Sequence, residues 1–169
     1  MDNFKLGLFV GIKWHQIAAY PSPHTIGCSC LVNEYTEQSS NETGTYLSVK
    51  MTYMKHNRSQ EASLPALYPS EETKAQFIYA PEDNNNQSNV FYLDIDYEEY
   101  ALSYSCEDTV FGRYEYAAIY SRTDTLADEV FDMLKGKLED IGSDMSKFRE
   151  PQHEGCPTEN KTELSAAEI

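Results

Sequence analysis

Apolar and polar residues alternate along several short stretches in the middle of the chain. The clearest stretch is 44–54, in which one face of an extended chain carries Leu47, Val49, Met51 and Tyr53. A period of two is typical of a β-strand whose two faces meet different surroundings. Similar runs, separated by clusters of turn-forming residues, predict strands over 13–20, 28–36, 61–68, 74–79, 89–94, 100–106 and 114–121. The pattern therefore predicts eight strands.

The period changes after residue 122. Apolar residues then recur every three or four positions, at Leu126, Val130, Leu134, Leu138 and Ile141. Thr125 and Asp128 resemble a capping box, and Gly142 follows the last apolar position, so we predict one helix over 125–141. The apolar stripe of this helix must be covered by another surface of the molecule.

Eight short strands followed by one helix favour an all-β fold, an eight-stranded antiparallel up-and-down barrel with the helix packed outside. The 169 residues suffice for one core, and we expect a single domain over 1–156 followed by an acidic flexible tail over 157–169. A barrel of eight strands can hold one small ligand when its inward side chains leave room. Function then depends on the lining.

The parity of each strand predicts which side chains line the barrel. In 100–106 one face carries the small residues Ala101, Ser103 and Ser105, and turning this face inward leaves volume for a ligand. The other predicted inward residues are Asn33, Tyr35, Leu47, Val49, Met51, Tyr53, Ala75, Phe77, Tyr79, Val90, Tyr92, Tyr114, Tyr116 and Ala118. Such a lining suits a lipid-like or long conjugated molecule, because burying an unpaired charge there is costly. The alternative is that many of these side chains simply fill a tight core.

Charge excludes several partners. The chain has 13 Lys and Arg against 28 Asp and Glu, a net charge of -15 that repels nucleic acid and anionic membranes. No run approaches the roughly 18 apolar residues of a membrane helix, so we expect no membrane insertion. The first residues are too few and too acidic for a signal peptide, and we expect the chain to be a mature form.

Cysteines and glycosylation motifs indicate secretion. The spacing of Cys28 and Cys30 does not fit a zinc ribbon or a Cys-x-x-Cys site, and four cysteines favour disulfides. Acceptor motifs for N-glycosylation, each in a predicted loop or tail, lie at Asn41, Asn57, Asn86 and Asn160. The alternative is a cytosolic protein with reduced thiols and accidental motifs.

The sequence offers no catalytic or metal-binding arrangement. The four histidines lack metal-ligand spacing and have no evident nucleophilic partner; they are His15, His24, His56 and His153. Asp94 and Asp96 lie in a predicted turn, where solvated charges are the simpler interpretation. We therefore predict a binding protein, not an enzyme, with no metal and no obligatory cofactor.

Three separated motifs resemble the lipocalin family. Gly11-Ile-Lys-Trp14 is similar to the Gly-x-Trp segment that opens the first strand of the family. Asp94-Ile-Asp-Tyr97, followed by 100–106, is similar to the family's Thr-Asp-Tyr turn and its next strand, and Arg122 ends the last strand. Two departures are that Gly11 stands one residue further from Trp14 and that Ile95 replaces the threonine. Either the entry turn has an extra residue or Ile12 takes the glycine's place.

Within the family, several segments resemble arthropod pigment carriers. Asp2-Asn-Phe4 is similar to insect bilin-binding proteins, whereas Cys30-Leu-Val-Asn-Glu-Tyr35 and Gly155-Cys-Pro157 are similar to crustacyanin, the carotenoid-binding lipocalin of crustacean shell. Apolipoprotein D is a more distant match. The resemblance implies a bound carotenoid of astaxanthin type, then biliverdin, then a fatty acid or sterol. It also implies a homo- or hetero-dimer with another lipocalin. The second function class is an interaction protein, in which the surface of the barrel binds a partner and the pocket is incidental.

The resemblance also assigns structural roles. Trp14 and Arg122 are expected to meet as a plug at the closed end of the barrel, the guanidinium over the indole; the alternative is a core tryptophan and a solvated arginine. The family pattern implies a Cys30–Cys156 disulfide. Relatives pair the position of Cys106 with an upstream cysteine that this chain lacks, so Cys28 is expected to replace it. The swapped pairing, Cys28–Cys156 with Cys30–Cys106, stays open.

Overall fold

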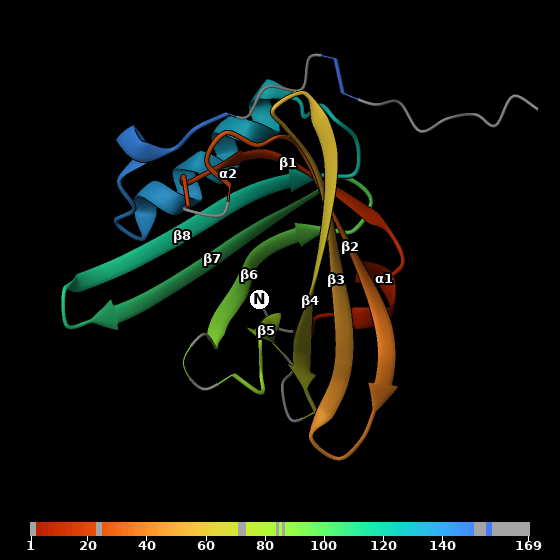
Figure 1. Ribbon diagram of the computed structural model, residues 1–169. Helices are drawn as coiled ribbons and strands as arrows, with labels where there is room; N and C mark the ends of the chain where they lie inside the picture. The colour runs from red at the N-terminus through yellow and green to blue at the C-terminus, as the bar shows by residue number, and fades with distance from the viewer. Residues whose placement is uncertain are drawn as a thin grey trace, which may run out of the picture.

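A computed structural model describes residues 3–22, 25–70, 74–83, 85, 87–150 and 155–156, and within them the chain forms a closed antiparallel barrel (Figure 1). Each strand pairs with the next along the chain, and the last pairs with the first. The strands are β1 (Lys13–Ala19), β2 (Ser29–Ser40), β3 (Gly44–Lys55), β4 (Arg58–Pro69), β5 (Gln76–Tyr79), β6 (Ser88–Asp96), β7 (Tyr100–Thr109) and β8 (Gly112–Ser121). The predicted fold class is therefore confirmed.

Several strands are longer than the alternating pattern predicted. β2 continues to Ser40, and its last five residues are exposed on both faces. β4 begins at Arg58, three residues before the predicted start, and its first four residues are also exposed. Alternation marks a strand only where one face is buried, so the pattern missed arms of hairpins that reach into solvent.

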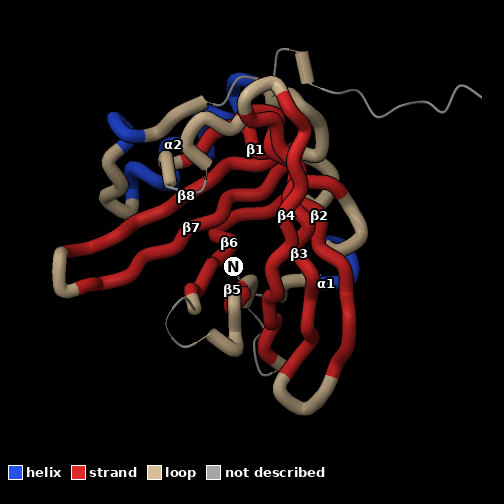
Figure 2. Tube along the Cα trace, viewed as in Figure 1, coloured by secondary structure: helices blue, strands red, loops and turns tan. Residues whose placement is uncertain are grey.

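Two ends of the barrel differ in how they are covered. The short helix α1 (Leu6–Phe9), the start of β1 and the turn between β6 and β7 lie at one end, which we call the closed end. The opposite end, called the open end, is bounded by the β1–β2, β3–β4, β5–β6 and β7–β8 connections. The β7–β8 hairpin projects there, as Figures 1 and 2 show at the left.

Helix α2 (Asp128–Asp140) packs against the outside of the barrel (Figure 2). Leu134 and Leu138 are fully buried against a cluster that includes Leu102 of β7 and Ile119 of β8. A short 3-10 turn, η1 (Met145–Lys147), follows the helix. The predicted apolar stripe therefore has its partner on the outer face of the barrel.

The predicted start of α2 at residue 125 is wrong. The carbonyl oxygen of Thr125 accepts hydrogen bonds from the hydroxyls of Ser121 and Thr123, at 2.8 and 2.9 Å, which holds this residue in a turn. Ala127 is the N-cap residue and makes no side-chain cap. The residue types of a capping box are therefore present at these positions, but they do not cap the helix, which begins three residues later.

Cys30 and Cys156 form a disulfide with Cα atoms 5.5 Å apart. The expected Cys28–Cys106 bond is not formed, and neither is the swapped pairing. Cys28 precedes β2, while β1 and β8 separate that strand from β7, which carries Cys106. Cys30 also has a positive φ of 54°, so the regular alternation that would place it and Cys28 on one face does not hold.

Two of the four glycosylation motifs fall on described turns. Asn41 and Asn57 are exposed, in the β2–β3 and β3–β4 connections. Asn86, Asn160 and the tail predicted over 157–169 lie outside the described residues. The accessible positions of the first two are compatible with attached sugars.

Candidate ligand-binding site

The floor of the barrel is a cluster of aromatic rings. Phe9 is fully buried and lies with its ring centre 5.3 Å from Trp14, 4.8 Å from Tyr35 and 4.9 Å from Tyr92. Phe77 adds further ring contacts from β5. Rings at these distances pack as in a protein core, so this part of the interior is filled by the protein itself.

Arg122 meets Trp14 at the closed end. The central guanidinium carbon lies 5.6 Å from the centre of the indole ring, within the range of a cation–π contact. One guanidinium nitrogen donates to the carbonyl oxygen of Tyr97 at 2.7 Å, while the buried Nε has no partner. The indole nitrogen of Trp14 donates to the carbonyl of Phe9 at 3.2 Å. The contacts hold the first strand, the last strand and α1 together.

The two departures from the family motifs have structural explanations. Gly11 has a φ of 72°, which suits glycine, and its amide donates to the carbonyl of Tyr35 at 2.8 Å. The entry turn therefore keeps its glycine and contains one extra residue before Trp14. Ile95 packs in the barrel core, and Asp96 caps the turn by accepting from the amide of Glu98 at 2.9 Å.

Three tyrosine hydroxyls meet inside the barrel, above the floor. The hydroxyl oxygen of Tyr35 lies 2.5 Å from that of Tyr79 and 2.7 Å from that of Tyr92. Burial raises the pKa of all three phenols well above 10, and their mutual repulsion as anions adds to the effect. The three groups therefore stay neutral and act as hydrogen-bonding points in an otherwise apolar interior.

A second polar group lies on the side formed by β1, β2, β7 and β8. The amide of Asn33 donates to the hydroxyl of Tyr120 at 3.4 Å, and Tyr116 donates to the side-chain oxygen of Gln16 at 3.3 Å. Burial raises the pKa of Tyr120 to about 12. We call the two groups together the tyrosine belt, with members Gln16, Asn33, Tyr35, Tyr79, Tyr92, Tyr116 and Tyr120.

The remaining predicted lining residues become more exposed toward the open end. Leu47 and Val49 of β3 are buried near the floor, whereas Met51 and Tyr53 of the same face are only half-buried. The same gradient runs along other strands: Ala75, Ser103 and Ala118 are buried, Val90 is half-buried, and Tyr114 is 48% exposed. Tyr114 thus lies at the rim rather than inside.

Sequence reasoning missed two contributions to the interior. Phe4 and Phe9, in and before α1, belong to the buried core, although the segment was assigned no structure. Gln16 is buried on β1, a strand for which no polar lining residue was predicted. The apolar positions of 4–10 were the available signal, but a single helical turn is too short for periodicity to reveal.

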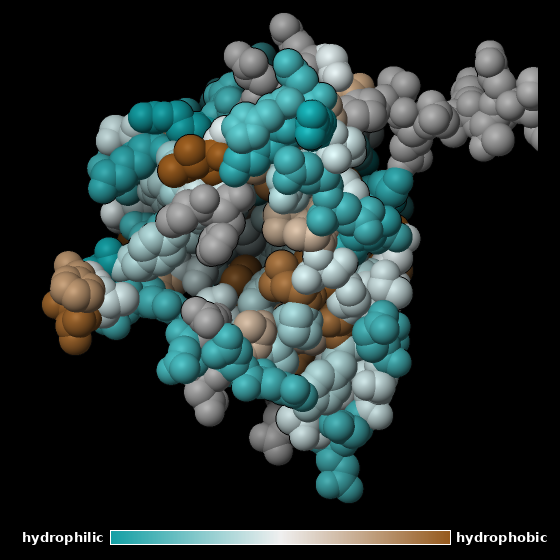
Figure 3. Space-filling view, in the orientation of Figure 1, coloured by the Kyte–Doolittle hydropathy of each residue, from teal (hydrophilic) through white to brown (hydrophobic). Residues whose placement is uncertain are grey.

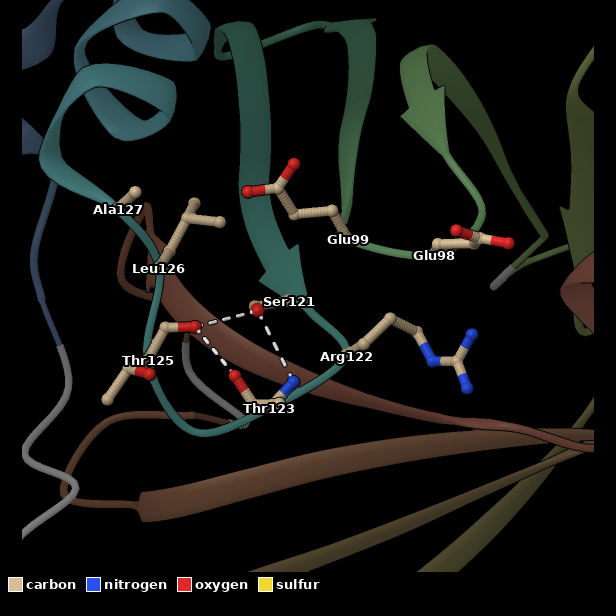
Figure 4. A pocket seen from close by; sticks show the side chains of 8 residues that line it. All are labelled: Glu98, Glu99, Ser121, Arg122, Thr123, Thr125, Leu126 and Ala127. Atoms are coloured by element: carbon tan, nitrogen blue, oxygen red, sulfur yellow. Dashed lines mark hydrogen bonds between the residues drawn. The ribbon is translucent and has the colours of Figure 1, made fainter.

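A pocket of about 240 Å³ lies at the closed end, between the β6–β7 turn and the segment that joins β8 to α2 (Figure 4). Its hydroxyl groups, from Ser121 and Thr123, bond to the carbonyl oxygen of Thr125, as the dashed lines in Figure 4 show. Glu98 and Glu99 border the pocket. Apart from Arg122, none of its lining residues is among those that the sequence assigned to the ligand site or the plug.

Two features are absent from the residues that the structure describes. No group of three or more His, Cys, Asp or Glu side chains is placed to hold a metal ion. Among the same residues, no helix is long and apolar enough to cross a membrane.

Comparison with known proteins gives a consistent family. The model of the lipocalin-like domain matches residues 5–153. The crustacyanin-C1 subunit of Homarus gammarus is 26% identical over 155 residues, which cover 89% of this chain and 81% of that protein. Apocrustacyanin C1 has a similar structure, with a TM-score of 0.73 at 22% identity over 90% of this chain and 82% of that one. Insecticyanin from the tobacco hornworm Manduca sexta also reaches a TM-score of 0.73, at 20% identity and the same coverage. The chain therefore belongs to the lipocalin family, and its relatives include arthropod pigment-binding lipocalins.

Proposed function

We propose that the protein carries a small hydrophobic pigment of carotenoid type, which enters the barrel from the open end. The observation that carries this proposal is the exposure gradient along the inward faces of the strands. Near the floor these side chains are fully buried, whereas Met51, Tyr53 and Val90 keep part of their surface exposed. Apolar and aromatic side chains that are half-buried inside a barrel form the kind of surface that an apolar ligand covers.

The charges of the lining favour a carotenoid over biliverdin. The inward residues named above include one cation, Arg122, which is engaged with Trp14 and Tyr97 at the floor. Biliverdin carries two propionate groups, and burying them without a cationic partner would be costly. A carotenoid has only hydroxyl or keto groups at its ends, which the phenols of the tyrosine belt can bond.

The wider assignment is that of a secreted binding protein without catalytic activity. The Cys30–Cys156 disulfide and the exposed Asn41 and Asn57 support an oxidising, extracellular environment. The likeness to crustacyanin subunits supports a homo- or hetero-dimer with another lipocalin. In this proposal the pigment lies inside the barrel, and the protein carries it as a dimer.

Pigment binding can be tested by titrating the protein with astaxanthin and, separately, with biliverdin. We expect astaxanthin to bind with one equivalent per barrel and to shift its visible absorption, and biliverdin to bind at least tenfold more weakly. Tighter binding of biliverdin than of astaxanthin would mean that the ligand is a bilin and not a carotenoid. Failure to bind either pigment would overturn the proposal.

A pair of variants on β6 locates the site. Val90 faces the barrel interior, while its neighbour Phe91 points outward and is 37% exposed. Val90→Trp should fill the upper part of the barrel and weaken astaxanthin binding at least tenfold. Phe91→Trp adds a similar ring outside and should leave binding unchanged. Equal effects of the two substitutions would place the pigment elsewhere on the protein.

A further inference from the structure

We infer that the tip of the β7–β8 hairpin docks on a neutral lipid surface, where the open end of the barrel takes up or releases its cargo. The hairpin tip consists of Val110 and Phe111, which are 95% and 99% exposed. The partner is a surface of zwitterionic phospholipid such as phosphatidylcholine. Docking rests on the hairpin itself, whereas the transfer of cargo at the lipid surface rests on the proposed function.

The hairpin tip brings two exposed apolar side chains together. Other large apolar side chains that are exposed in the described part of the chain, such as Leu8, Ile26 and Met133, have no exposed apolar neighbour in the sequence. Single exposed apolar residues are normal on a protein surface, but a contiguous pair at the end of a projecting element marks a contact site. Figure 3 shows the brown side chains of the tip at the left.

The hairpin extends well beyond the strands beside it. β6 pairs with β7 as far as Tyr104, and on the other side the amide of Tyr20, just after β1, bonds to the carbonyl of Ala117 on β8. Beyond these points 105–109 and 112–116 pair with each other and with no other described strand. Five residues at about 3.4 Å each make an arm about 17 Å long, and Figure 1 shows it projecting from the barrel.

The backbone of the tip is suited to an apolar environment. The hydroxyl of Thr109 donates to the carbonyl oxygen of Gly112 at 2.7 Å and accepts from the amide of Phe111 at 3.2 Å. Backbone groups that enter hydrocarbon need partners within the protein, and this hydroxyl supplies one to two of them. A tip that presents apolar side chains and bonds its polar groups internally fits a fluid lipid phase, which has no fixed groups to match, better than a protein pocket.

Charge favours a neutral lipid surface over an anionic one and over a second copy of the chain. The net charge of -15 repels anionic lipids and other copies alike. Just below the tip, Asp108 and Arg113 stand opposite each other and are both exposed. A zwitterionic headgroup offers an ammonium and a phosphate to these two charges. Tyr114, which is 48% exposed, adds an aromatic ring of the kind found at membrane–water interfaces.

Two apolar side chains give a shallow and reversible attachment. Burying one of them strengthens binding by about tenfold or more, far less than a membrane-spanning segment provides. A carrier must leave the lipid surface with its cargo, so weak docking is sufficient. Because the hairpin borders the open end, docking brings the entrance of the barrel close to the phase that dissolves an apolar pigment.

Flotation of the full-length protein with phospholipid vesicles tests the docking. We expect binding to phosphatidylcholine vesicles and weaker binding to vesicles of the anionic lipid phosphatidylglycerol. Phe111→Ser should weaken binding to phosphatidylcholine about tenfold, because it removes a ring from the contact. Phe91→Ser, the same substitution on the outer face of β6, is the control and should float like the wild type.

The transfer step is measured with astaxanthin dissolved in phosphatidylcholine vesicles. The rate at which the pigment reaches the wild-type barrel should rise with vesicle concentration, because transfer occurs in the docked state. Phe111→Ser should slow this transfer about tenfold and leave unchanged the affinity for astaxanthin added from ethanol. Equal transfer rates in the two proteins would reject the role of the hairpin in loading.

The outcomes separate the docking from the proposed function. A wild-type protein that does not float, a Phe111→Ser variant that floats equally well, or tighter binding to anionic vesicles would overturn the inference while pigment binding stands. A dimer that dissociates in Phe111→Ser, in a protein without vesicle binding, would assign the tip to a protein contact and also overturn it. Vesicle binding without pigment uptake would keep the docking surface and reject the proposed function together with the transfer step.

Discussion

Phenylalanine occupies opposite environments at the two ends of the barrel. At the closed end Phe9 is completely buried and touches five other aromatic rings, including Trp14. At the open end Phe111 is 99% exposed and its neighbour Val110 is 95% exposed, and Figure 3 shows brown side chains at this hairpin tip, at the left. The comparison indicates that the closed end supplies stability, whereas the open end leaves apolar surface available for contact with other molecules.

The same substitution at both ends tests this division most strongly. Phe9→Ala should lower the free energy of unfolding by about 3–5 kcal/mol, because it removes a ring from a packed core and leaves a cavity. Phe111→Ala should change it by less than about 0.5 kcal/mol, because the ring has no contacts to lose. Urea denaturation of the two variants measures both values, and comparable losses would remove the distinction between the ends.

High pH should destabilise the folded protein through the tyrosines of the barrel interior, between the two ends. Burial raises the pKa of Tyr120 from 10 to about 12, and it also raises the pKa values of Tyr35, Tyr79, Tyr92 and Tyr116 well above 10. The unfolded chain loses these protons near pH 10 while the folded protein retains them. Stability is therefore constant below pH 10 with respect to these groups and falls as the pH rises toward 12.

For Tyr120 alone the loss should reach roughly 2 kcal/mol near pH 12, since each unit of pKa shift corresponds to about 1.4 kcal/mol. Denaturation at a series of pH values from 9 to 12, combined with tyrosinate absorption, measures the effect. Tyr120→Phe should reduce the slope. A stability profile that is flat up to pH 12 would show that the belt titrates as it does in the unfolded chain.

The smallest effect concerns the plug. Arg122→Met keeps the apolar stem but removes the cation over Trp14 and the donor to the carbonyl of Tyr97, and it should cost about 1–2 kcal/mol. The unpartnered Nε of Arg122 limits the gain that the wild-type protein draws from this contact. Arg58→Met, at an exposed position of the open end, should be neutral in thermal unfolding. If both variants melt like the wild type, the plug has no stabilising role.

The sequence predicted the barrel well because alternation reports directly on burial. β3 was found almost completely, since its inward face passes from Leu47 to Tyr53 beneath a polar outer face. The predicted strand limits were wrong where both faces of a strand meet solvent, as at the start of β4. The predicted start of α2 was wrong because the carbonyl oxygen of Thr125 accepts hydrogen bonds within a turn. The residue types of a short segment do not show which of two hydrogen-bond patterns its backbone adopts.

The site was predictable in part. Parity identified side chains that the structure places in the interior, such as Tyr35, Phe77 and Ser103. Parity does not reveal how far along the barrel a side chain lies, so Tyr114 was expected inside although it sits at the rim. The bonds between tyrosine hydroxyls join strands far apart in the sequence, and they form only when the barrel closes.

The Cys30–Cys156 disulfide also determines how the molecule would respond to mechanical force. The bond joins residues separated by 126 positions and so encloses nearly all of β2, together with β3 to β8 and α2, in one covalent loop. Tension applied between the two ends of the chain passes through the two sulfur atoms and bypasses this loop. Pulling would therefore detach α1 and β1 while the other seven strands stay unloaded, and only a reducing agent would expose them to the force.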